Sequence, residues 1–173
     1  RAAHCSRTGT RKKGEVVGTI IPEVAEELGL PVVKIQHHYA HILSCMTEND
    51  CQEPVIGVAF DGTGYGTDGT IWGGEILLAD YEDFTRFGNI TPFLQIGGDV
   101  SAKEGWRIAV SLLGKIYGKE IALSIIETLG LCESKLAKLQ FTMEERGINT
   151  VKSTSAGRLF DAVSAILGIR RQS

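Results

Sequence analysis

Several features that mark familiar protein classes are missing from this sequence. Its 173 residues hold no uninterrupted apolar run near the ~20 residues that cross a bilayer, so neither a membrane span nor a membrane partner is predicted. Its four cysteines form no CxxC pair, which excludes a cysteine zinc finger, and we expect free thiols in a reducing cytoplasm. Lys and Arg number 18 against 21 Asp and Glu, and the net charge of −3 argues against a nucleic-acid binder.

Glycine is abundant and proline scarce, with 21 residues against 4, and the glycines are clustered. Residues 1–21 carry five positive charges among their first 13 positions and show no apolar periodicity, which predicts a flexible arm without an assigned role. Ordered structure is expected over residues 22–173, which we treat as a single folded region.

The hydrophobic periodicity and the glycines that interrupt it predict ten elements within residues 22–173. The predicted helices are 22–28, 37–48, 101–117, 119–129, 133–146 and 158–167, and the predicted strands are 32–36, 55–60, 70–78 and 84–96. A capping box, Ser101-Ala102-Lys103-Glu104, is expected to open the third helix. This order predicts an α/β fold, with a mixed sheet, a glycine-rich β-hairpin and flanking helices.

His37 and His41 lie four residues apart on a predicted helix, so their imidazoles project from the same face. Neutral imidazoles at this spacing can bind one metal ion, such as zinc or iron. Paired histidines on a helix are also often structural or solvated, and the spacing alone leaves both interpretations open. A zinc-protease site is excluded, because His38 stands where that chemistry requires a glutamate.

The sequence Asp61-Gly62-Thr63-Gly64 follows a predicted buried strand, at the place where α/β sheets bind ligands. Glycines let backbone N–H groups approach an anion, and the threonine adds a hydroxyl donor. Because a carboxylate repels phosphate, Asp61 is expected to hold a metal ion or a water bound to one. The alternative is a hairpin whose glycines only serve a tight turn. A strand follows these glycines and no Gly-Lys-Ser/Thr is present, so neither a dinucleotide fingerprint nor a P-loop fits.

Gly157 and Asp161 lie at the start of the last predicted helix. The carboxylate of Asp161 could accept hydrogen bonds from a ribose or an amine at a cleft. An acidic residue near a helix start also simply stabilises the helix, and the sequence does not decide between the two roles.

Four separated stretches, taken together, closely resemble the HypF family of hydrogenase maturation carbamoyltransferases. These stretches are residues 36–41 (Gln-His-His-Tyr-Ala-His), 58–75 around the glycine loop, 97–99 with 106–107, and 157–163. The resemblance extends over about residues 22–169. It corresponds to the first part of the family's large C-terminal domain, which is related to the tRNA threonylcarbamoyltransferase TsaD.

The resemblance implies one lobe of an actin-like ATPase fold that holds a divalent metal beside a nucleotide. It implies zinc or iron, with magnesium as an alternative, and ATP or carbamoyl-adenylate as the nucleotide. The metal ligands it implies are His37, His41 and Asp61, and the nucleotide-binding residues are Asp61, Gly62, Thr63, Gly64, Tyr65, Gly157 and Asp161.

The activity implied by the resemblance is carbamoyl transfer. In the family, carbamoyl phosphate and ATP yield carbamoyl-adenylate, and this domain passes the carbamoyl group to the C-terminal cysteine of HypE. The nucleophile is the partner's thiolate, so no catalytic nucleophile is assigned in this chain. A TsaD-like tRNA-modifying enzyme is the first alternative, although that family carries a Ser-Gly-Gly type of sequence at the glycine loop.

The chain departs from the family pattern at both ends. The Asp-x-His-Pro stretch expected before the first helix is absent from residues 1–21, and the second lobe is absent after Ser173. We therefore expect a fragment of a longer enzyme, inactive by itself. A non-catalytic remnant that keeps a nucleotide site or a docking surface is the second alternative.

Overall fold

The computed structural model describes residues 24–25, 27–29, 31 and 34–170. The chain divides into two compact units, residues 1–35 and residues 36–173. In the first unit, Val24, Ala25 and Glu27 are helical, in agreement with the helix predicted over 22–28. The predicted arm, the boundary between residues 21 and 22, and residues 32–33 of the predicted strand 32–36 lie outside the described residues. The strand prediction is wrong for residues 34–36, which are described and belong to no strand.

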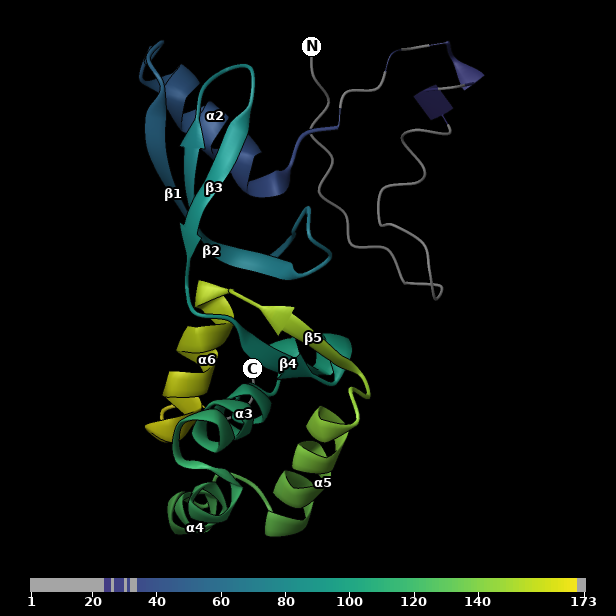
Figure 1. Ribbon diagram of the computed structural model, residues 1–173, viewed down its shortest axis with the longest axis vertical. Coiled ribbons are helices and arrows are strands. Elements are labelled where there is room, and N and C mark those ends of the chain that lie inside the picture. The colour runs from purple at the N-terminus through teal and green to yellow at the C-terminus, as the bar shows by residue number, and fades with distance from the viewer. Residues whose placement is uncertain (1–23, 26, 30, 32–33, 171–173) are drawn as a thin grey trace. The chain divides into compact units, whose positions relative to one another are not determined.

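The second unit begins with a helix packed on a three-stranded antiparallel arrangement (Figure 1). The elements are α2 (His37–Glu48), β1 (Val55–Tyr65), β2 (Ile71–Ala79) and β3 (Phe84–Asn89). Strand β2 pairs antiparallel with β1 on one side and with β3 on the other. Gln36 caps α2, because its side-chain oxygen accepts a hydrogen bond from the Tyr39 N–H at 2.8 Å. The predicted helix 37–48 is confirmed.

The rest of the second unit is mostly helical. It contains β4 (Phe93–Ile96), the 3₁₀ helix η1 (Gly98–Ala102), α3 (Gly105–Tyr117), α4 (Lys119–Leu129), α5 (Ser134–Glu145), β5 (Thr150–Ser153) and α6 (Ala156–Ile166). Strand β5 runs antiparallel to β4 and meets the start of β2 in parallel, through Ile71 and Ser153. The sheet order is β1-β2-β5-β4 with β3 also on β2, so the predicted mixed α/β fold is confirmed.

Two hydrophobic clusters stabilise these two regions. Tyr39, Ile42 and Met46 of α2 pack with Trp72 and Leu77 of β2, which fixes the helix on the hairpin. The second cluster lies among α3, α4, α5 and α6, with Phe93 of β4 included. The helices and the hairpin therefore have separate cores, joined through the sheet.

The predicted capping box is wrong. Helix α3 begins at Gly105, and Ser101 lies in η1, where its hydroxyl contacts the Gly98 carbonyl and receives a hydrogen bond from Gln95 Nε2 at 2.8 Å. The buried Gln95 of β4 thus competes for the serine that was expected to cap the helix.

Two strand predictions also need correction. The strand predicted over 84–96 is two strands, β3 and β4, separated by residues 90–92. Pro92 lies in this break and cannot donate to a strand ladder. Strand β5 was not predicted, because its four residues carry little apolar signal and are held by pairing with β4.

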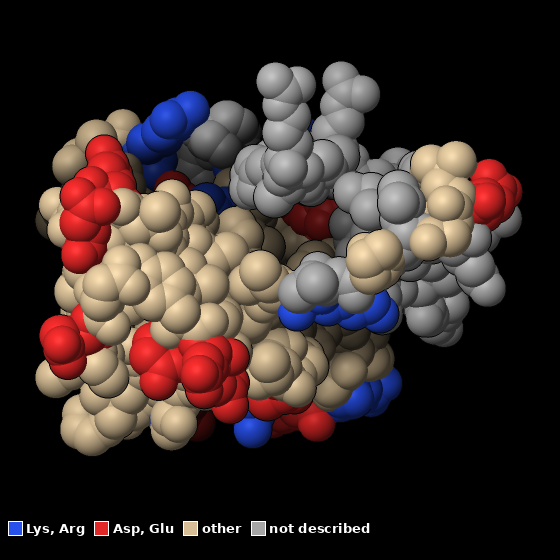
Figure 2. Space-filling model, turned by 90° about the horizontal axis from the view of Figure 1, so that it is seen from above, with Lys and Arg blue, Asp and Glu red and all other residues tan. Residues whose placement is uncertain are grey.

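Among the described residues, no helix combines the length and the apolar character that a membrane crossing requires. The face shown in Figure 2 is uncharged over much of its described area, with acidic side chains in groups near its border. On β1, the side chains of Ile56, Val58 and Phe60 are each more than half exposed. Exposed apolar side chains at alternating strand positions share one face of the sheet.

Candidate metal and nucleotide site

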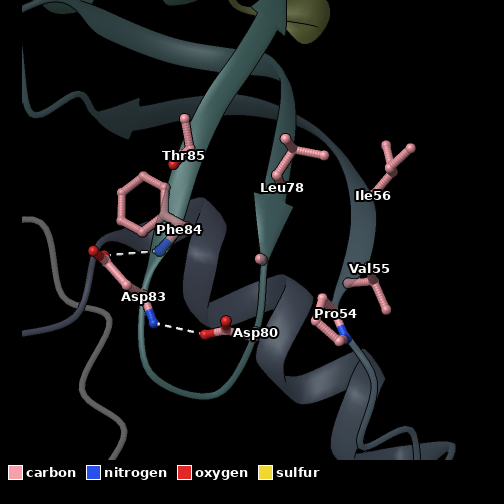
Figure 3. A pocket seen from close by; sticks show the side chains of 9 residues that line it. Pro54, Val55, Ile56, Leu78, Asp80, Asp83, Phe84 and Thr85 are labelled. Carbon is pink, nitrogen blue, oxygen red and sulfur yellow. Dashed lines mark hydrogen bonds between the residues drawn. The ribbon is translucent and has the colours of Figure 1, made fainter.

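A shallow pocket of about 370 Å³ beside the β2–β3 turn does not carry the candidate chemistry (Figure 3). The acids in its lining close the turn: Asp80 accepts hydrogen bonds from the N–H groups of Glu82 and Asp83, at 2.8 and 2.9 Å. Asp83 accepts from the Phe84 N–H at 2.8 Å. These carboxylates have local structural partners, and the candidate metal ligands lie elsewhere.

Helix α2 places His37 and His41 side by side, as their spacing predicted. Their Nε2 atoms are 3.2 Å apart, and their rings meet edge to face with centroids 4.6 Å apart. Both side chains are exposed. The two imidazoles therefore present ring nitrogens to one point on the surface, one turn apart along the helix.

Asp61 completes this cluster from β1. Its Oδ2 lies 2.6 Å from His37 Nε2, and one donor atom from each of the three residues lies within 4.8 Å of the others. The predicted proximity of His37, His41 and Asp61 is confirmed. Their role as metal ligands remains a prediction.

The strand that carries Asp61 differs from the prediction. The sequence predicted a strand that ends at Phe60, but β1 continues to Tyr65 with an irregularity in its pairing. Phe60 pairs with Gly74 and Gly64 pairs with Trp72, so residues 61–63 on β1 oppose only residue 73 on β2. We call residues 61–63 the bulge. A bulge of this kind bends a strand and redirects its side chains, which brings Asp61 to the histidines.

The surroundings of Asp61 favour its ionised form. Burial alone would raise the pKa of its carboxyl, but hydrogen bonds from His37 and from the Gly62 N–H, together with the charge of His37, lower the pKa below its ordinary value. A carboxylate that is ionised at neutral pH can bind a cation. This is the state that the metal hypothesis requires.

His38, between the two candidate ligands, has a different role that the sequence did not reveal. Its side chain is fully buried, and its Nδ1 lies 3.1 Å from the side-chain Nε2 of Gln36. Burial, followed by the charge of His37, lowers the pKa of His38 to about 4. A Cβ on Gly64 would collide with the His38 ring, so this glycine makes room for the imidazole.

The donor set fits a divalent transition metal. In a tetrahedral zinc site with Zn–N bonds of ~2.0–2.1 Å, neighbouring ligand atoms are ~3.3 Å apart. The 3.2 Å between the two ring nitrogens is close to that separation, whereas the 2.6 Å between His37 Nε2 and Asp61 Oδ2 is a hydrogen-bond distance that a bound ion would have to lengthen. Two imidazoles and one carboxylate suit zinc or iron better than magnesium, which prefers oxygen ligands.

The bulge is also packed against the start of α6, the second region predicted to bind a nucleotide. The hydroxyl of Ser155, the N-cap of α6, lies 3.1 Å from the Asp61 carbonyl and 2.8 Å from the Gly62 carbonyl. A Cβ on Gly157 would lie 2.8 Å from Gly62 Cα. The glycines of the predicted phosphate loop therefore permit close packing between β1 and α6. Neither Gly62 nor Gly64 has a positive φ.

The remaining predicted nucleotide residues surround this junction. The Thr63 hydroxyl donates to the Gly62 carbonyl at 2.5 Å, and Tyr65 is exposed at the end of β1. Asp161 lies one turn into α6, where its Oδ2 is 3.1 Å from Nη2 of Arg158. The structure thus brings the bulge together with the first two turns of α6, and the nucleotide role of these residues stays a prediction.

A groove of about 600 Å³ runs between α2 and β1 beside the three candidate ligands. His41 and Asp61 both contribute to its lining, and so do Cys45 and Cys51. The thiols of Cys45, Cys51 and Cys132 are free, as predicted. Two of the three candidate ligands, His41 and Asp61, therefore lie at an accessible hollow in the surface.

The sequence analysis did not identify the buried hydrogen-bond network that lies next to the bulge. Glu75 is fully buried and accepts hydrogen bonds from the Gly73 and Gly74 N–H groups and from Arg86. A Cβ on Gly73 would lie 2.6 Å from the Asp61 carbonyl, so this network borders the bulge. A glutamate within an apolar strand was the one available signal, because a buried carboxylate requires partners.

Comparisons with known proteins agree on one family. The model of the carbamoyltransferase Kae1-like domain, second subdomain, matches residues 57–173, and the model of the HypF Kae1-like domain matches residues 18–48. A carbamoyltransferase HypF homolog from Cupriavidus necator is 40% identical over 155 residues, which cover 84% of this chain and 36% of that protein. A probable carbamoyltransferase HypF from Methanocaldococcus jannaschii is 39% identical, over 85% of this chain and 19% of its own length.

A solved structure agrees with these matches. Full-length HypF in its phosphate- and nucleotide-bound form superposes with a TM-score of 0.78 at 37% identity, over 90% of this chain and 20% of that one. The chain therefore spans about a fifth to a third of the length of these relatives.

Proposed function

This chain belongs to the HypF carbamoyltransferase family, and from that premise we propose that it forms the metal- and nucleotide-binding part of a carbamoyltransferase in [NiFe]-hydrogenase maturation. The substrate is carbamoyl-adenylate, made from carbamoyl phosphate and ATP. The acceptor is the C-terminal cysteine of HypE. The observation that carries the proposal is the convergence of His37, His41 and Asp61 beside a glycine-rich bulge.

The three clustered side chains would hold a divalent ion, zinc or iron by their chemistry, with magnesium as the alternative. Such an ion supplies positive charge that offsets the charge developing on the adenylate phosphate. The chain's own contribution is to fix its ligands in advance: α2 sets the two imidazoles, and the bulge sets the carboxylate. Ligands held in place by the fold need little reorganisation during the reaction.

The bulge and the start of α6 would hold the adenylate beside the metal. Residues 61–65 lie on the phosphate side, with Gly157 and Asp161 on the adenosine side. Two contacts support this assignment: Ser155 ties the bulge to α6, and Arg158 pairs with Asp161. The phosphate- and nucleotide-bound state of the solved HypF relative is consistent with it.

The attacking nucleophile in this proposal is the thiolate of the HypE cysteine. Its sulfur forms a bond to the carbamoyl carbon as the bond to the adenylate oxygen breaks, and AMP leaves. The groove beside His41 and Asp61 gives a partner's chain access to that point. We place this step in the cytoplasm, where the three free thiols of the described residues would stay reduced.

The test is carbamoyl transfer by a hybrid in which this chain replaces the matching segment of a full-length HypF relative. The hybrid should produce a carbamoyl mass shift on the HypE C-terminal peptide, detected by mass spectrometry. His37→Ala and His41→Ala should abolish the shift, whereas Cys45→Ser, in the same groove, should leave it intact. A hybrid that folds and transfers no carbamoyl, or one indifferent to both histidines, would contradict the proposal.

A further inference from the structure

Three segments of the site converge on the guanidinium of Arg158. Its Nη1 donates to the Ala102 carbonyl of η1 at 2.7 Å, and its Nη2 lies 3.1 Å from Asp161 Oδ2. A Cβ on Gly62 would lie 3.4 Å from the same Nη2, so the guanidinium also adjoins the bulge. Arg158 therefore connects η1 to α6, beside the bulge of β1.

The backbone of Arg158 is tied to the same junction. Its N–H donates to the Ser155 hydroxyl at 3.1 Å, and that hydroxyl faces the Asp61 and Gly62 carbonyls. The bulge is thus held by hydrogen bonds from Ser155, and the guanidinium of Arg158 adjoins it at Gly62. Gly62 and Gly157 make this possible, since a side chain on Gly157 would collide with Gly62.

The charges at this junction are only partly satisfied within the described residues. The side chain of Arg158 is 17% exposed and that of Asp161 is 36% exposed. Nε of Arg158 and Oδ2 of Asp161 are both buried atoms without a hydrogen-bond partner among the described residues, although the two side chains form an ion pair. A buried donor without a partner costs free energy that a bound ligand can recover by reorienting the pair.

We infer that Arg158 is a positioning residue for the nucleotide: by tying α6 to η1, it holds the adenosine-side Asp161 in place beside the phosphate-side bulge. This inference rests on the proposed function, because it takes the bulge and Asp161 as the two ends of the nucleotide site. Arginine suits the task, since its planar fork reaches two acceptors at once. A lysine at this position keeps the charge and reaches only one acceptor.

Binding of AMP and carbamoyl transfer by the hybrid test the inference together. Arg158→Met should weaken AMP binding, measured by calorimetry, by about tenfold or more, and should raise KM for carbamoyl-adenylate more than it lowers kcat. Arg158→Lys should recover part of the loss. Metal content should stay unchanged in both variants, because Ser155 still holds the Asp61 and Gly62 carbonyls, and His37, His41 and Asp61 keep their contacts with one another. Lys119→Met removes an ion pair with Glu145 between α4 and α5 and is the matched control.

Failure of the inference and failure of the proposed function give different results in these measurements. Equal AMP affinity in Arg158→Met and the unsubstituted hybrid would overturn the inference, as would a loss of bound metal in step with AMP, or a loss equal to that of Lys119→Met. An unsubstituted hybrid that binds no AMP would overturn the inference together with the proposed nucleotide site. A hybrid that binds AMP and transfers no carbamoyl would overturn the proposed function alone.

Discussion

Replacing Arg86 with methionine should cost about 3–5 kcal/mol of unfolding free energy, because it leaves the buried carboxylate of Glu75 without its counter-charge. Glu75 is fully buried. Its Oε2 accepts a hydrogen bond from Arg86 Nε at 2.7 Å and forms an ion pair with Arg86 Nη2 at 2.6 Å. The guanidinium also lies 4.1 Å above the ring of Trp72 and donates to Asp68 at 3.0 Å. One side chain therefore joins β2, β3 and the turn that follows β1.

The magnitude follows from what remains after the substitution. Oε1 of Glu75 keeps the N–H groups of Gly73 and Gly74, at 3.1 and 3.2 Å, and the Thr154 hydroxyl. Oε2 keeps no partner among the described residues, and an uncompensated charge in the core is costly. Since small domains are stable by about 5–15 kcal/mol, this single change removes a large fraction of the total.

Urea unfolding followed by tryptophan fluorescence measures the loss. The double variant Glu75→Gln/Arg86→Met removes both charges and should be more stable than Arg86→Met alone, because no charge is left unpaired. A loss below about 1 kcal/mol for Arg86→Met would refute this reasoning, as would a double variant no more stable than the single one.

Three further predictions concern pH, packing and association. Because the pKa of His38 falls from 6.5 to about 4 on folding, its contribution to stability is complete above pH 6.5 and is lost as the pH falls toward 4, by about 3 kcal/mol in all. His38→Phe should show less of this pH slope in urea unfolding, and an equal slope would contradict the assignment. Gly64→Ala should cost about 1–3 kcal/mol and weaken metal binding, because the new methyl would meet the rings of His37 and His38. Gly88→Ala, with its nearest neighbour at 3.7 Å, is the control, and equal behaviour of the two variants in unfolding and metal titration would show the reasoning to be wrong. The exposed apolar face of β1 should make the chain self-associate in sedimentation, and Val58→Lys should reduce this. A monodisperse unsubstituted chain would count against that last expectation.

Elements bounded by local signals could be predicted from the sequence. Helix α4 has the predicted bounds, Lys119–Leu129. Gly118, with positive φ, ends α3 just before it, and Gly130, also with positive φ, ends α4 itself. Helix α2 has the predicted bounds as well, and its periodicity placed His37 and His41 on one face. The clustering of Asp61 with these histidines was implied by the family resemblance, which gave all three as metal ligands.

Features that depend on distant partners could not be predicted. The bulge at residues 61–63 exists because β1 continues its pairing with β2 and packs against Ser155, more than 90 residues away. The glycines of residues 61–64 were interpreted as giving access to a ligand. In the structure, Gly62 and Gly157 allow the backbones of β1 and α6 to approach closely. The burial of His38, on α2, likewise depends on Gly64, on β1.

Metal titration of the chain tests the central claim most directly. Isothermal calorimetry with Zn²⁺, supported by equilibrium dialysis against a known zinc concentration, should show one weakly bound ion per chain, since three side chains make an incomplete coordination shell. His37→Ala and Asp61→Asn should each abolish this binding, and the Cys45→Ser control should retain it. The absence of zinc binding, or binding that survives the loss of His37, would contradict the account.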